Sequence, residues 1–188
     1  MARSGRTRRA ERLLLILVGA LVVSAGTAHA HFIDPDRSIV ENGMMHTLGS
    51  YQQVVPLAAL GFGLGRSRPW LAVPIFVLGI VAGYFFLGDA PFRWFPYLEA
   101  TLFIACGLAL LSNALPGWHL ELPPTAVSGL TLGMLLLVDQ PDDPQALAFS
   151  GFAALAGLLI VVAFALVRSR LTWPWISIAS RIAGAWLI

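Results

Sequence analysis

The chain has 188 residues, of which 57% are apolar and only 12% are charged, and its mean hydropathy is +0.77. A soluble domain carries roughly 25% charged residues, so this composition excludes an ordinary cytosolic globular enzyme, a disordered tail and a coiled coil. The net charge of +2 does not indicate a nucleic-acid partner, because five of the 12 basic residues lie in the first dozen positions, and the lipid bilayer is the predicted partner.

The first 30 residues have the layout of a cleaved secretory signal peptide. Arg-rich residues 1–12 precede an almost wholly apolar stretch at 13–23, and Ala28 and Ala30 form an A-x-A cleavage pattern. The apolar stretch is shorter than the roughly 20 residues that a membrane-spanning helix needs, and an uncleaved signal anchor is the alternative. Cleavage after Ala30 starts the mature chain, residues 31–188, at His31 on the extracytoplasmic side.

Six apolar stretches follow, and they predict an all-α fold, a polytopic bundle of about six transmembrane helices. We expect spans near residues 44–65, 69–88, 95–115, 122–138 and 146–167, and a sixth between Arg170 and Ile188. The polar breaks between them are short, so consecutive helices should run antiparallel. Helices satisfy their own backbone hydrogen bonds in lipid, and the apolar residues do not alternate as they would in strands.

The last stretch contains a charge that is costly in lipid. Arg181 would lie within a span that began at Leu171, at an insertion cost of about 2.5–3.5 kcal/mol. We therefore expect residues 173–175 to lie at the cytoplasmic interface, where Trp is enriched, and the helix to start near Arg181. Only eight residues run from Arg181 to Ile188, which predicts a truncated last helix.

The positions of Arg predict the orientation of the bundle. With His31 outside, the breaks at residues 66–68, 116–121 and 168–170 are cytoplasmic, and they contain Arg66, Arg68, Arg168 and Arg170. The outer breaks contain one Arg and several Asp residues. This bias follows the positive-inside rule, so we expect a multi-pass protein of the bacterial inner membrane.

Two pairs of glycines lie four residues apart inside expected spans, Gly79 with Gly83 and Gly129 with Gly133. Small residues at this spacing let helix backbones approach closely. We expect tight packing within the chain, with a homo-oligomer interface as the alternative.

Polar residues gather at one end of the expected bundle. His46 lies near the outer end of the first span, and Gln53 follows seven residues later on nearly the same helix face. Glu99 lies about one turn into the third span, and Asp139 ends the fourth span. An imidazole with oxygen donors suits a divalent first-row metal, so these four residues are the candidate metal ligands. His46 as an interfacial residue, and Glu99 paired with Arg93 or Arg181, are the structural alternatives.

Motifs for other chemistry are missing from the sequence. It has no Gly-rich phosphate loop, no Ser/His/Asp set and no zinc-spaced His/Cys motif, so it does not predict an enzyme.

Five short segments form a further pattern by their order and spacing. They are Ala-His-Ala-His at 28–31, His46-Thr-Leu-Gly-Ser-Tyr-Gln-Gln53, Pro96-Tyr-Leu-Glu-Ala100, Gly-Phe-Ala-Ala at 151–154 and Arg181-Ile-Ala-Gly-Ala-Trp186. Together they resemble the HupE/UreJ family of hydrogenase- and urease-associated membrane proteins. The resemblance implies a nickel or cobalt permease without a bound cofactor, with His46 and Glu99 as pathway ligands.

The chain departs from that family at two motifs. The family's first helix has Asp-His six and seven positions after its His, whereas this chain has Gln52 and Gln53, and residues 129–143 lack the family's His. We therefore expect a divergent member with a degenerate metal motif. A non-transporting membrane scaffold or accessory subunit of a larger complex is the alternative.

Overall fold

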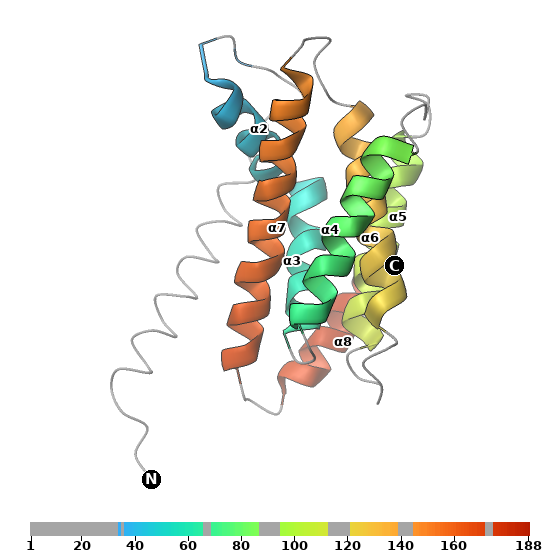
Figure 1. The fold of residues 1–188 in the computed structure, drawn as a ribbon. Coiled ribbons are helices and arrows are strands. Elements are labelled where there is room, and N and C mark those ends of the chain that lie inside the picture. Colours follow the sequence, from blue (N-terminus) through green and yellow to red (C-terminus); the bar gives the residue numbers. More distant parts are fainter. Residues whose placement is uncertain are drawn as a thin grey trace, which may run out of the picture.

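The computed structural model describes residues 34, 36–65, 69–86, 95–112, 121–138, 145–171 and 175–188. Within these residues the fold is all-helical, as predicted, and contains no strand. The helices are α2 (Ile39–Leu48), α3 (Tyr51–Leu64), α4 (Pro69–Phe86), α5 (Phe95–Ser112), α6 (Leu122–Val138), α7 (Ala146–Arg170) and α8 (Ile176–Leu187). They form one bundle, with α2 at one end and the start of α8 at the other (Figure 1). The predicted signal peptide and Asp139 lie outside the described residues.

The span expected at residues 44–65 is two helices, so the prediction of one continuous helix there is wrong. Gly49 ends α2, where its N–H bonds back to the carbonyl oxygen of Met45, and Ser50 precedes α3. The backbone of Ser50 is extended, with φ −95° and ψ 107°, and cannot continue a helix. Gly and Ser are weak helix formers, which makes this pair a suitable place for the chain to break.

The paired glycines join α4 to α6 within one chain, as predicted. A Cβ on Gly83 would collide with the carbonyl oxygen of Leu130, and a Cβ on Gly133 would collide with that of Ile80. Gly79 faces Ala126 one turn earlier along both helices, so α4 and α6 run parallel. If α5 runs antiparallel to both α4 and α6, then α4 and α6 are parallel, which agrees with the expected alternation of helix direction along the chain.

Most of the principal packing partners are not consecutive in the sequence, and α5 with α6 is the exception. Helix α4 packs most extensively on α6, while α3 packs on both α5 and α7, and α8 packs on α5. Figure 1 shows α7 running alongside α2 and α3. Apart from the contact of α5 with α6, the bundle is therefore held together mainly by helices that lie two or more elements apart in the chain.

Two expectations near the C-terminal end are corrected. The expected break at residues 168–170 is the last turn of α7, where basic side chains interact favourably with the helix dipole. Helix α8 begins at Ile176 and not near Arg181. Ile176, Ser180 and Gly184 form its buried face, while Arg181 lies on the exposed side, so the charge does not interrupt the helix.

The described surface is unusually apolar, and several polar side chains are buried. Exposed apolar residues follow the outer face of α7 at Leu147, Leu155, Leu159 and Leu166. By length and composition, α7 is the one helix in the described part of the chain that could cross a membrane; four other apolar helical stretches are shorter. The six-span arrangement therefore stays a prediction.

Candidate functional site

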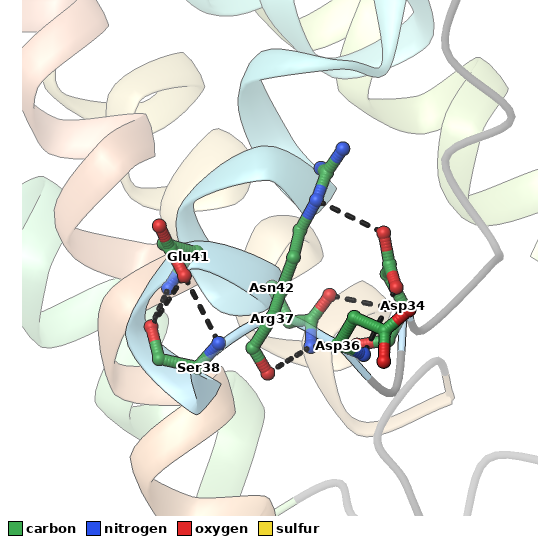
Figure 2. A network of polar contacts seen from close by, with 6 residues as sticks. All are labelled: Asp34, Asp36, Arg37, Ser38, Glu41 and Asn42. Carbon is green, nitrogen blue, oxygen red and sulfur yellow. Dashed lines mark hydrogen bonds and ion pairs between the residues drawn. The ribbon is translucent and has the colours of Figure 1, made fainter.

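A polar network fixes the start of α2 and so the position of every residue that follows on it. Ser38 caps the helix: its Oγ accepts a hydrogen bond from the N–H of Glu41 at 3.3 Å, and Glu41 Oε2 accepts one from the N–H of Ser38 at 3.0 Å. The Ser38 hydroxyl also donates to Glu41 Oε2 at 2.8 Å (Figure 2). The backbone bond first, and then the hydroxyl, lower the pKa of the exposed Glu41 carboxyl.

Asn42 ties the preceding segment to the same helix. Its Nδ2 donates to the carbonyl oxygen of Asp34 at 2.9 Å, and its Oδ1 accepts from the Asp34 N–H at 3.1 Å. The Arg37 guanidinium forms an ion pair with Asp34 at 3.1 Å (Figure 2). These two hydrogen bonds hold the segment before α2 against the helix, and His46 lies one turn after Asn42.

His46 is buried between α2 and α7. Its ring centroid lies 5.3 Å from that of Phe149, with the two planes tilted by 58°. The neighbouring Thr47 donates to the carbonyl oxygen of Ala153 at 2.9 Å, and Gly43 lets the α7 backbone approach one turn earlier. The structure therefore places His46 against an aromatic face of α7.

Glu99 lies on the other side of the α2–α3 segment, where α3 meets α5. Nε2 of Gln52 donates a hydrogen bond to Oε2 of Glu99 at 3.2 Å. The bond joins two helices across a partly buried interface. A neutral amide donor at this distance orients the carboxyl group of Glu99.

Gln53 is almost completely buried, with 3% of the residue's surface exposed. Within the part of the chain that the structure describes, its Oε1 has no hydrogen-bond partner. Buried polar atoms in proteins are nearly always paired, so this carbonyl oxygen is exceptional. Gln53 was predicted to share a helix face with His46, but the break at Gly49 and Ser50 places the two residues on different helices.

The predicted ligands therefore divide between two interfaces. The structure brings Glu99 to Gln52 and His46 to Phe149. Among the described residues no group of three or more His, Cys, Asp or Glu side chains is arranged to hold a metal ion. The fourth predicted ligand, Asp139, lies outside those residues. The contact of Gln52 with Glu99 was not predicted, because residue spacing along one helix does not show which neighbouring helix a side chain meets.

Comparisons of the chain with protein-family models, with curated proteins and with solved structures find no match. The resemblance to the HupE/UreJ family remains a prediction from the sequence segments.

Proposed function

We propose that the chain is a multi-pass protein of the bacterial inner membrane, with its mature N-terminus outside the cytoplasm. Its burial pattern supports this location. The outer face of α4 exposes Val77, Leu78, Val81 and Phe85, which match the apolar outer face of α7. Large exposed apolar surfaces mark contact with lipid or another protein. Extraction of cell membranes with alkaline carbonate should leave the chain in the pellet, and release into the supernatant would contradict the location.

Within that membrane we propose a HupE/UreJ-type permease for a divalent cation of the nickel or cobalt kind. The hydrogen bond between Gln52 and Glu99 is the observation that supports it most. A carboxylate at an interface between apolar helices is costly and is a functional candidate by default. Glu99 would receive the cation and Gln52 would orient its carboxyl group, while His46, Gln53 and Asp139 are the other ligands that the sequence predicts. His46 would act at a separate interface, against Phe149 of α7.

Metal uptake into proteoliposomes tests this assignment. Glu99→Gln removes the charge but keeps the shape, and we expect it to lower the uptake of nickel or cobalt at least about tenfold. His46→Ala should also lower the rate. Glu41→Gln is the matched control, because it removes an exposed carboxylate from the first turn of α2. This variant should leave uptake near that of the wild type. Wild-type uptake by both Glu99→Gln and His46→Ala would contradict the permease assignment.

A non-transporting scaffold or accessory subunit is the second candidate, and the outer face of α8 favours it. Ile178, Ile182 and Trp186 form an exposed stripe at four-residue spacing, and Trp186 is 87% exposed. Native mass measurement after mild detergent extraction separates the two functions, since an accessory subunit should retain a stoichiometric partner.

A further inference from the structure

The break between α2 and α3 is a second buried polar region of the bundle, and it is separate from the contact of α3 with α5. Gly49 and Ser50 are both buried. Their N–H groups bond back to the carbonyl oxygens of Met45 and Thr47, and the carbonyl oxygens of Leu48 and Gly49 accept none of the backbone bonds around the break. The C-terminal end of a helix carries partial negative charge on such carbonyl groups, so the end of α2 favours a cation.

The side chain of Gln53 supplies an independent sign of a ligand. Its Oε1 is buried and has no partner within the described residues. Gln53 is in the first turn of α3, and side chains on a helix lean toward the N-terminus of that helix, which here is the break. A buried carbonyl oxygen without a donor is unfavourable unless a donor or a cation lies against it.

The same face of α3 turns toward α7. Leu57, one turn after Gln53, lies beside Gly157 of α7, and the methyl group of Thr47 lies near the same glycine. The Thr47 hydroxyl donates to the carbonyl oxygen of Ala153, which leaves its own lone pairs to accept. The break, Gln53 and Thr47 therefore border the same α7 interface, whereas Gln52 reaches Glu99 on α5.

We propose that this break binds one dehydrated monovalent cation of the sodium class. Gln53 Oε1 is the side-chain ligand, and the terminal carbonyl oxygens of α2 are the backbone ligands. The oxygens involved are neutral, as in the carbonyl cages and interrupted helices that hold alkali cations in membrane proteins. A divalent cation is usually held by carboxylates, and the carboxylate of Glu99 is directed to Gln52. Sodium binding at this break is a property additional to the proposed divalent transport and does not depend on it.

Thermal unfolding of the purified full chain in detergent tests the proposal. Sodium chloride is titrated against choline chloride at constant ionic strength, with a chelator present to remove divalent metals. With a Kd of about 10 mM, the midpoint should rise by about 3 °C between about 1 and 100 mM sodium. An equal midpoint in sodium and in choline would overturn the proposal, whatever the outcome of the divalent uptake assay.

Two variants locate the effect. Gln53→Leu keeps the volume but removes the oxygen, so the rise with sodium should disappear. Gln52→Leu is the matched control, since it removes the neighbouring amide that faces Glu99, and it should keep the rise. A sodium-dependent rise that persists in Gln53→Leu would overturn the assignment of Gln53. If that variant does not fold, Gln53→Asn serves in its place. It shortens the side chain by one methylene, which moves the amide oxygen away from the cation, and should weaken the apparent sodium affinity at least about tenfold.

Discussion

Gln52 and Glu99 are 47 positions apart in the sequence, and their side chains meet at 3.2 Å between α3 and α5. This hydrogen bond directly connects the first and third expected spans. Its presence lets a carboxylate remain at the edge of an apolar bundle in one orientation.

Removing the amide should weaken the contact between α3 and α5. We expect Gln52→Leu to lower the free energy of unfolding by about 1 kcal/mol, since a hydrogen bond to a carboxylate is lost. A double-mutant cycle with Glu99→Leu, followed by unfolding in mixed micelles, measures the coupling. Strictly additive effects of the two substitutions would show that the bond contributes nothing to stability.

The close contact between α4 and α6 at their paired glycines should tolerate no added methyl group. Gly83→Ala places a Cβ against the carbonyl oxygen of Leu130, and we expect a loss of about 2 kcal/mol because the two helices must separate. Gly151→Ala is the control, because a Cβ at Gly151 meets no atom within 4 Å. Alanine in that open helical position should stabilise the chain by about 0.5–1 kcal/mol. Equal effects of the two substitutions on the unfolding midpoint would argue against the close approach.

Arg168 should contribute to stability through its planar guanidinium and not only through its charge. Its Cζ lies 5.6 Å from the ring centroid of Phe62, and Nη1 donates to the carbonyl oxygen of Leu171 at 2.9 Å. We expect Arg168→Lys to destabilise the chain by about 1 kcal/mol, because an ammonium group cannot stack and bond in the same way. The exposed Arg170, replaced by Lys, should change stability by less than about 0.5 kcal/mol. Indistinguishable unfolding curves for the two variants would refute a special role for Arg168.

The cap of α2 should make Glu41 sensitive to pH. Its pKa in the folded chain is lower than the ordinary value of 4.5, so the charged form stabilises the fold above that value. This contribution is lost as the pH falls through the lowered pKa. Ser38→Ala removes the hydroxyl, and we expect the pKa of Glu41 to rise toward 4.5 in a carboxyl-carbon NMR titration. Ser169→Ala, near the far end of α7, should leave that titration unchanged.

Much of the secondary structure follows from local pattern. Long apolar runs without alternation predicted the helical fold, and the starts of α4, α5, α6 and α7 lie at the expected residues. The spacing of Gly79 with Gly83, and of Gly129 with Gly133, predicted close packing within the chain. Both features depend on residues that are near one another in the sequence, which is why they are visible there.

The sequence by itself determined an all-helical, apolar chain with a few polar side chains and with glycines placed for close helix contacts. The tertiary structure decided that α4 pairs with α6 and that α2 and α3 are separate helices. It also decided that Gln52 faces Glu99, while the Oε1 atom of Gln53 is buried without a partner in the described part. The physical reason is that helical periodicity assigns a residue to a face of its own helix. The helix that covers this face depends on how all the surfaces of the bundle fit together.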